Sequence, residues 1–238
     1  MSLFNVIKKD REYWLVDQIN DLQKPNEEYI ISFKALLDEW HAEKIGYLSL
    51  LMNPENEQWL LQHGFQKVSS IVEYTRKLDE KFMLPSNIQF YTLSEGSLSD
   101  SEFATLYENC RSGSANKNNL FTIDQIMESF VHELGSKWRD HCYIFTEEEQ
   151  VVGISIPIIE TGTTDEGRLF YFGVKPEKRG KGYGTVLHLC SLEIMKKFGS
   201  TYYVGSTDEN NEYMIRIFEK NNCLLRDKKG IYRIDRKE

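Results

Sequence analysis

Apolar and polar positions recur along the chain with two different periods, and the longer period predicts helices. The clearest helix is predicted over 183–198, where apolar residues follow one another at steps of three and four. Two lysines occupy its last turn and Gly199 follows, as is usual at a helix C-terminus. Further helices are predicted over three segments, about 99–111, 122–136 and 211–220.

Short apolar runs, several of them rich in β-branched and aromatic residues, predict the strands. They lie at 88–93, 142–145, 151–159, 169–174, 201–206 and 231–234. The second and third runs form a hairpin around a polar turn at 146–150, and Pro157 marks either a bulge or the weak end of a strand. From residue 88 the order is therefore β-α-α-β-β-β-α-β-α-β, which predicts a mixed α/β layer fold.

The N-terminal part repeats some of this order. A strand at 45–52, a helix at 54–63 and a strand at 71–78 match the closing strand, helix and strand of the chain. Both helices open with Asn-Glu, at Asn56 and Asn211. A true duplication and a shared α/β habit both explain this match. The Leu-Pro-Ser-Asn stretch at 84–87 predicts a junction, and we expect domains at 1–85 and 86–238.

Composition narrows the possible classes of protein. The 238 residues carry 29 Lys and Arg against 37 Asp and Glu, a net charge of −8, which argues against nucleic-acid binding by bulk charge. The longest apolar runs, 45–52 and 151–159, are shorter than the ~20 residues of a membrane helix. Charged residues from Lys8 onward interrupt any signal-peptide core. We therefore expect a cytoplasmic protein with no membrane or nucleic-acid partner.

The cysteines and histidines give no sign of a metal site or a disulfide framework. Four cysteines are too widely spaced, and the sequence contains no Cys-x-x-Cys. No two of the five histidines have metal-ligand spacing on one helix. We expect no metal.

The stretch 174–185 carries the most informative chemistry, because it joins a predicted strand to the start of a predicted helix. Its three glycines, Gly180, Gly182 and Gly184, allow a tight turn and leave backbone N–H groups uncovered. A helix start adds unpaired N–H groups and a partial positive charge. Residues 175–181 also carry a net charge of +3. The stretch therefore predicts an anion pocket suited to phosphate, with a solvated Gly-rich loop as the alternative.

Arg179, Gly182 and Gly184 resemble the Arg/Gln-x-x-Gly-x-Gly/Ala loop with which the GNAT acetyltransferases bind the pyrophosphate of acyl-CoA. The Val-Lys-Pro-Glu at 174–177 is similar to the end of the family's fourth strand, and the resemblance covers about 88–238. It implies an α/β (α+β) fold with a mixed central sheet flanked by helices. The segment 45–78 resembles the closing elements of a second GNAT unit without a glycine loop, which implies a smaller N-terminal half-GNAT-like domain.

The resemblance implies that acetyl-CoA binds in a wedge between two splayed strands. The backbone of one strand end would pair with the pantetheine arm, and the amides at 180–185 would hold the pyrophosphate. Asn211 matches a family asparagine that contacts the cofactor, and it also fits a helix N-cap. The implied cofactor-binding residues are Gly173, Val174, Arg179, Gly180, Lys181, Gly182, Tyr183, Gly184, Thr185 and Asn211.

Two residues depart from the family pattern. Phe218 stands where the family usually has a tyrosine acid, and Phe170 stands where many members carry a glutamate base. A thiolate leaving group needs little proton assistance, since the pKa of a thiol is about 8–9. Glu160 or Tyr171 could assist through water, but each also fits an ordinary surface or core residue. The sequence assigns no catalytic residue.

The resemblance implies transfer of an acetyl group from acetyl-CoA to a small-molecule or peptide amine by direct attack in a ternary complex. The loop at 112–119 would lie at the rim of the acceptor site. The two departures support an alternative, a catalytically weak or inactive acyl-CoA-binding regulatory module. The chain could act as a monomer or a homodimer. A dinucleotide-binding loop fits poorly, because five residues separate Val174 from Gly180.

Overall fold

The chain forms two compact units, and two long strands pass from one unit to the other. The computed structural model describes residues 3–9, 12–18, 26–114 and 121–236. The first unit is Met1–Val72 with Asp227–Glu238, and the second is Glu73–Arg226. Strand β4 (Gln66–Lys77) begins in the first unit and ends in the second, whereas β10 (Leu224–Asp235) does the reverse. The predicted domains divide instead at residue 85, because local patterns do not show that the chain returns to its first unit.

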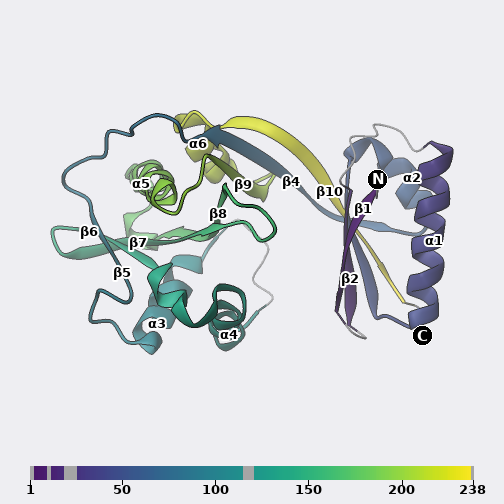
Figure 1. Cartoon of the computed structure of the whole chain (residues 1–238), viewed down its shortest axis with the longest axis horizontal. Coiled ribbons are helices and arrows are strands. Elements are labelled where there is room, and N and C mark those ends of the chain that lie inside the picture. Colours follow the sequence, from purple (N-terminus) through teal and green to yellow (C-terminus); the bar gives the residue numbers. More distant parts are fainter. Residues whose placement is uncertain (1–2, 10–11, 19–25, 115–120, 237–238) are drawn as a thin grey trace. The chain divides into compact units, whose positions relative to one another are not determined.

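The first unit is a small sheet with helices on one face (Figure 1). Its strands lie in the order β1-β2-β3-β10, and β2 and β3 are parallel. Aromatic and aliphatic residues of α1 and α2 pack on the sheet in one core, which includes Phe33, Trp40 and Leu48. The elements before β4 are β1 (Phe4–Lys9), β2 (Tyr13–Gln18), α1 (Glu27–Glu43), β3 (Tyr47–Met52), a 3-10 turn (Pro54–Asn56) and α2 (Glu57–Gln62). The sequence predicted the elements from β3 onward and missed the first three.

The second unit confirms the order predicted from residue 88. Its strands lie in the order β4-β9-β8-β7-β6-β5, with β8 and β9 parallel and the others from β5 to β8 antiparallel. The strands are β5 (Gln89–Thr92), β6 (Tyr143–Glu147), β7 (Gln150–Ile159), β8 (Glu166–Val174) and β9 (Tyr202–Asp208). The helices are α3 (Asp100–Arg111), α4 (Ile123–Leu134), α5 (Tyr183–Lys197) and α6 (Glu212–Lys220), with 3-10 turns at Gly135–Asp140 and Pro176–Lys178.

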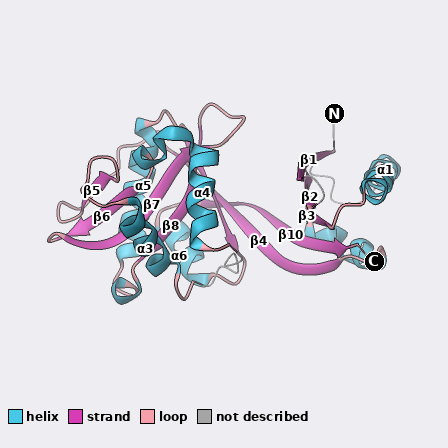
Figure 2. Cartoon of the chain, turned by 90° about the horizontal axis from the view of Figure 1, so that it is seen from below, coloured by secondary structure: helices cyan, strands magenta, loops and turns pink. Residues whose placement is uncertain are grey.

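Helices cover both faces of this second sheet. Helices α3 and α4 lie across one face, and α5 and α6 lie on the other (Figures 1 and 2). Side chains alternate between the two faces along each strand, as the pleat requires. In β6, for example, Ile144 packs with the α3 and α4 core, and the next residue, Phe145, packs with the α5 core. The predicted mixed sheet flanked by helices is therefore present.

A bulge interrupts the pairing of β7 with β8. Ile156 pairs with Tyr171 and Pro157 pairs with Leu169, so Phe170 is an extra residue on β8. A proline cannot donate a ladder hydrogen bond, which explains why the register shifts at this point. The bulge predicted from Pro157 is confirmed.

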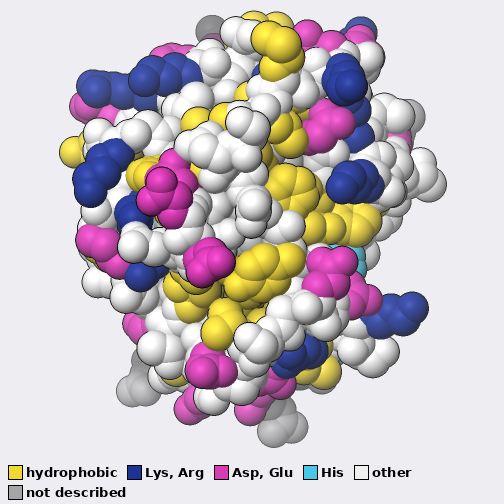
Figure 3. All heavy atoms as spheres, turned by 90° about the vertical axis from the view of Figure 1, so that its left-hand side faces the viewer, with side chains coloured by type: hydrophobic (Ala, Val, Ile, Leu, Met, Phe, Trp, Pro, Cys, Tyr) yellow, Lys and Arg dark blue, Asp and Glu magenta, His cyan; other side chains and the backbone are white. Residues whose placement is uncertain are grey.

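The end of the second unit seen at the left of Figure 1 carries a mixed surface. Figure 3 shows basic and acidic side chains interspersed there with a group of apolar ones. Lys197 Nζ lies 5.6 Å from the ring centroid of Phe90 on the edge strand β5. Charged side chains at a sheet edge oppose pairing with another strand.

Candidate functional site

The glycine-rich loop joins β8 to α5, and its three glycines are required for two different reasons. Gly180 and Gly182 have φ of +73° and +88°, in the left-handed region that other residues rarely adopt. A Cβ atom on either would meet none of the described residues within 4 Å, so their surroundings among these residues are open. At Gly184 a Cβ would lie 2.7 Å from Ile217 Cδ1 on α6, so this glycine permits the close approach of two helices.

Helix α5 begins without a side-chain cap, unlike the other long helices. Its N-cap residue is Gly182. The other starts are capped by the side chains of Asn26, Ser99, Thr122 and Asn211. The amides of residues 180–184 meet no hydrogen-bond acceptor within the described part of the chain, whereas the Thr185 amide donates to the Gly182 carbonyl at 3.2 Å. The loop therefore presents a run of backbone donors at the positive end of a helix, a suitable site for an anion.

Arg179 supports the loop. Its guanidinium donates from Nε to the Val174 carbonyl at 3.0 Å and from Nη2 to the Cys110 carbonyl at 2.8 Å. These two bonds join the end of β8 to the end of α3. Arg179 thus acts in the structure as a brace for the loop, a role that the sequence did not show.

The other basic and aromatic side chains of the loop also contact the protein. Lys181 Nζ donates to the Glu177 carbonyl at 3.0 Å, and Lys175 forms an ion pair with the Glu177 carboxylate at 2.6 Å. That hydrogen bond from Lys175 lowers the pKa of Glu177. The hydroxyl of Tyr183 donates to the Glu147 carboxylate on β6. Tyr183 therefore offers its backbone amide, and not its hydroxyl, to an anion at the loop.

Strands β8 and β9 pair only where they begin. The parallel pairs are Glu166 with Tyr202 and Gly167 with Tyr203, and no later pair forms within the described residues, although β8 continues to Val174 and β9 to Asp208. Gly173 and Val174 pair with β7 along their other edge. Backbone groups at an unpaired inner edge need water or a ligand as partners. The wedge expected between these two strands is present.

Asn211 is an N-cap, as the sequence predicted. Its Oδ1 accepts from the Met214 amide at 3.3 Å, and its Nδ2 donates to Thr207 Oγ1 at 2.9 Å. The side chain is buried at 7% exposure. Its predicted contact with a cofactor stays a prediction.

The residues at the two departures from the family pattern pack as ordinary core. Phe218 is buried, and its ring stacks on that of Tyr74 with centroids 5.0 Å apart. The Phe170 ring lies 5.6 Å from that of Phe130 on α4. Neither ring can move a proton.

The two candidates for proton transfer through water differ in their surroundings. Burial raises the pKa of Tyr171, whose ring lies 4.1 Å from that of Tyr107, so the phenol stays protonated and cannot serve as a base. Glu160 forms an ion pair with Arg168 at 3.2 Å. Neither arrangement shows a free base at the wedge.

His188 on α5 is a buried polar residue that the sequence analysis did not select. It lies among Phe172, Tyr203 and Phe218, and burial lowers its pKa to about 3. Its Nδ1 lies 2.9 Å from Asn221 Nδ2, which also donates to the Thr185 carbonyl at 2.9 Å. The pair therefore ties the end of α6 to the first turn of α5. The only sequence signal is one histidine on an apolar helix face.

Other kinds of site have little support within the described ranges. No cluster of three His, Cys, Asp or Glu side chains there could hold a metal ion. None of the described helices is long and apolar enough to cross a membrane. The four cysteines are free and buried, and burial raises the pKa of the Cys110 thiol to about 12.

Comparison with known proteins decides the family. Residues 104–222, half of the chain, match the model of the acetyltransferase (GNAT) family. The chain belongs to the GNAT acetyltransferase family. The match contains the glycine loop, the wedge and α6. The predicted family is confirmed.

Similar proteins include one sequence relative and many structures. N-alpha-acetyltransferase 30 of Schizosaccharomyces pombe is 28% identical over 93 residues, which are 38% of this GNAT chain and 59% of that protein. A GNAT acetyltransferase from Sphaerobacter thermophilus has a TM-score of 0.69 at 14% identity and covers 98% of this chain and 76% of its own. A tandem GNAT protein of the clavulanic acid biosynthesis pathway, solved without AcCoA, has a TM-score of 0.61 at 13% identity. The match covers 94% of this chain and 75% of that protein. These structures share the fold, and the tandem protein is consistent with a partial second unit in this GNAT chain.

Proposed function

We propose that this acetyltransferase moves an acetyl group from acetyl-CoA to an amine by direct attack in a ternary complex, within the predicted domain 86–238. The observation that carries the proposal is the uncapped start of α5 beside the unpaired edge of β8. A diphosphate and an amide-bearing arm are the two ligand features that such a pair of surfaces would bind.

The residues present fit acetyl-CoA. Open space lies over Gly180 and Gly182, so a phosphate can approach the loop amides closely. We assign the pyrophosphate to the amides of residues 180–184 and the pantetheine arm to the backbone of Gly173 and Val174. Arg179 would hold the loop in place, and Thr185, whose amide donates within the turn, would contribute less than the sequence implied.

Acetyl-CoA supplies the acetyl thioester, and the protein supplies position and backbone donors. A thiolate leaves readily, since the pKa of a thiol is about 8–9. The remaining demands are alignment of the amine with the carbonyl, stabilisation of the oxyanion by a strand amide, and removal of one proton.

The acceptor is an amine on a small molecule or a peptide. The name of the Schizosaccharomyces pombe relative supports an α-amine as one candidate, although the chain spans only 59% of that protein's length. Most of the loop at 112–119, the expected rim of the acceptor site, falls outside the described residues. We further expect a cytoplasmic protein that acts as a monomer or a homodimer.

A second candidate function is an acyl-CoA-binding module without turnover. The burial of Phe218 and the packing of Phe170 on α4 favour it, because neither usual proton-transfer group is present. This module would use the same loop and wedge.

Release of CoA thiol separates the two functions. The full chain would be mixed with acetyl-CoA and, in turn, spermidine, L-lysine, glucosamine, kanamycin and a tetrapeptide with a free N-terminus. The transferase predicts amine-dependent thiol release with at least one of these probes. Binding of acetyl-CoA with no release above the amine-free rate would favour the module instead.

A further inference from the structure

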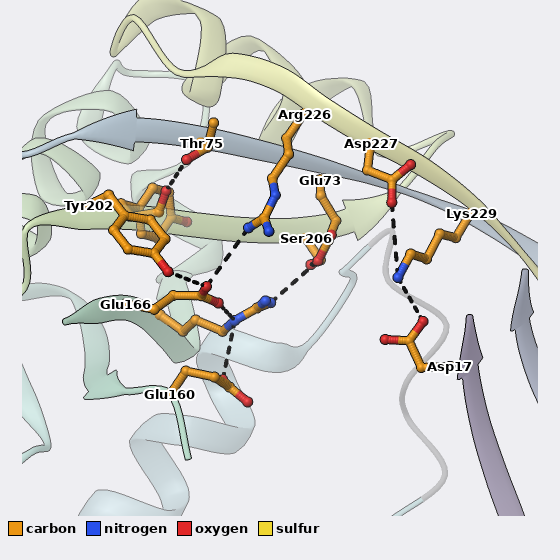
Figure 4. Close-up of polar contacts among 12 residues, drawn as sticks. Asp17, Glu73, Thr75, Glu160, Glu166, Tyr202, Ser206, Arg226, Asp227 and Lys229 are labelled. Carbon is orange, nitrogen blue, oxygen red and sulfur yellow. Dashed lines mark hydrogen bonds and ion pairs between the residues drawn. The ribbon is translucent and has the colours of Figure 1, made fainter. Parts of the chain in front are cut away.

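The second unit has no carboxylate at the strand position that Phe170 occupies, but it places one across the wedge. Glu73 lies on β4, with β9 between it and β8. Figure 4 shows Glu73 directed toward Ser206, in a group of polar side chains drawn from several strands. The carboxylate therefore comes from a segment that sequence reasoning assigned to the first domain.

The register of β8 and β9 gives the level of this carboxylate along the sheet. The last parallel pair is Gly167 with Tyr203, and three residues further along these strands lie Phe170 and Ser206. The Ser206 hydroxyl donates to Glu73 Oε1 at 2.8 Å. Glu73 thus lies at the level of Phe170, on the opposite side of the opening.

Contacts on both sides fix the direction of Glu73. Arg168 on β8 reaches Glu73 Oε1 at 3.4 Å, so the carboxylate faces β8. Both contacts fall on Oε1, and Oε2 has no hydrogen-bond or ion-pair partner within the described part of the chain. The side chain is 13% exposed. The second oxygen of this largely buried side chain, which has no partner there, is suited to a cationic ligand.

Arg168 is itself held in place by carboxylates. Glu166 lies 2.7 Å from its Nε and Glu160 lies 3.2 Å away, while Tyr202 and Arg226 contact the far oxygen of Glu166. Burial lowers the pKa of Arg168, but the nearby carboxylates of Glu166, Glu73 and Glu160 outweigh this and raise it. The guanidinium therefore stays charged and keeps Glu73 oriented. Glu73 is thus faced by Arg168 and Ser206 directly, and by the other four groups through Arg168 or Glu166.

We propose that Glu73 binds the acceptor as an ammonium ion and removes its proton, with Ser206 and Arg168 as positioning residues. This inference rests on the proposed acetyl transfer. Oε2 accepts one proton from R–NH₃⁺, which gives R–NH₂. The nitrogen lone pair then forms the C–N bond to the thioester carbonyl, and the C–S bond breaks. The excess proton on nitrogen goes to the departing thiolate, and Glu73 later returns its proton to water.

Glu73→Gln tests the role, and Glu39→Gln is its control. Glu39 forms an exposed ion pair with Lys8 in the first unit, so this variant also removes an ion-paired carboxylate but leaves the group around Arg168 intact. Thiol release with L-lysine and the tetrapeptide would be followed from pH 6.5 to 10, together with acetyl-CoA affinity by calorimetry and thermal unfolding. For Glu73→Gln we expect kcat/KM to fall about 100-fold at pH 7, the usual size of a lost general base, with unchanged acetyl-CoA affinity. For Glu39→Gln we expect a change of less than about threefold, as for an exposed ion pair.

The pH dependence separates a proton acceptor from a structural carboxylate. Above the pKa of the free amine, about 8 for an α-amine and about 10 for a lysine side chain, the acceptor no longer needs a base. The deficit of Glu73→Gln should therefore shrink as the pH passes that value, at a lower pH for the tetrapeptide than for lysine.

Several results would overturn the role of Glu73. They are wild-type activity in Glu73→Gln, a deficit that is the same at every pH, and equal losses in the two variants. Failure of the proposed function looks different, because the wild-type chain would then release no thiol above the amine-free rate with any of the amines.

Discussion

The two units share a strand–helix–strand segment, but only one of them has an anion-binding loop. From the first unit β3, α2 and β4 follow one another, with β4 ending in the second unit, and from the second β9, α6 and β10 do the same, with β10 ending in the first. Asn56 and Asn211 occupy the N-cap positions of the two helices, but only Asn211 makes a side-chain capping hydrogen bond. Only the second unit adds β8, the glycine loop and the uncapped α5. The strands of the shared segments lie in the interior of the strand order, whereas ligand binding depends on a few residues in one loop.

Two glycines with nearly the same backbone conformation show the difference between the units at single positions. Gly64 follows α2 with φ of +86°, and Gly182 precedes α5 with φ of +88°. A Cβ at Gly64 would make an ordinary contact with Ile234 Cδ1 at 3.6 Å, whereas a Cβ at Gly182 would meet none of the described residues within 4 Å. The same backbone conformation therefore ends one helix and exposes the amides of another.

The largest expected effect comes from Gly182→Trp. A large side chain at φ of +88° would distort the turn and cover the loop amides, and acetyl-CoA affinity should fall by about 100-fold or more, the value of two charge-assisted hydrogen bonds. Calorimetry with the folded variant measures the change. Gly64→Ala is the control, with a loss of stability of about 1 kcal/mol and unchanged affinity. An affinity in Gly182→Trp equal to that of the wild type would break the comparison.

We expect His188, in the second unit, to make the stability of the folded chain fall at acid pH. Burial holds its pKa at about 3, so between about pH 3 and 6.5 the unfolded chain binds a proton there that the folded chain does not. Stability should fall as the pH falls, by about 1.4 kcal/mol per pH unit below about 6.5. Urea unfolding between pH 7 and 5 measures this slope, which His188→Leu should flatten. His63→Gln, at an exposed position in the first unit, should keep it, and equal slopes in all three proteins would refute the assignment.

Arg179→Met tests the brace that only the second unit has. Removing the bonds to Val174 and Cys110 frees the loop, and we expect acetyl-CoA affinity to fall about tenfold, the value of one hydrogen bond to a charged group. Lys181→Met removes a neighbouring charge that contacts only the loop itself, and it should have a smaller effect. If the two variants lost equal affinity, charge rather than bracing would explain the role of Arg179.

The smallest effect is expected at a capped helix start. Ser99→Ala removes the capping box of α3 and should cost about 1 kcal/mol of stability without changing acetyl-CoA affinity. Thermal unfolding and calorimetry on the same sample measure both quantities. A clear loss of acetyl-CoA affinity in Ser99→Ala would contradict the account, because it would mean that a capped helix start also contributes to ligand binding.

Local patterns predicted most of the second unit. The order of elements from residue 88, the bulge at Pro157 and the N-cap at Asn211 are all confirmed, because each follows from periodicity or from the chemistry of one residue. The strands β1 and β2 and the helix α1 were not predicted. In β2 the buried and partly buried positions alternate, but its sequence is four apolar residues followed by two polar ones, so no alternating pattern marks it as a strand.

Long-range pairing explains what the sequence could not show. In the sequence Glu73 is one polar position in an alternating strand. Its proposed role depends on a contact with Ser206, which lies 133 residues later. The passage of β4 and β10 between the units likewise leaves no local pattern. The brace formed by Arg179 depends on Cys110, which lies 69 residues earlier. Such partners are set by tertiary structure, after local preferences have fixed the elements.

The most direct test of the account is hydrogen exchange at the amides of residues 180–184 in the full chain, with and without CoA. Ligand binding at the loop predicts slower exchange there when CoA is added, with no change at the capped start of α3. Unchanged exchange at these amides under concentrations where CoA is bound, or protection confined to another segment, would contradict the proposal that this helix start holds the pyrophosphate.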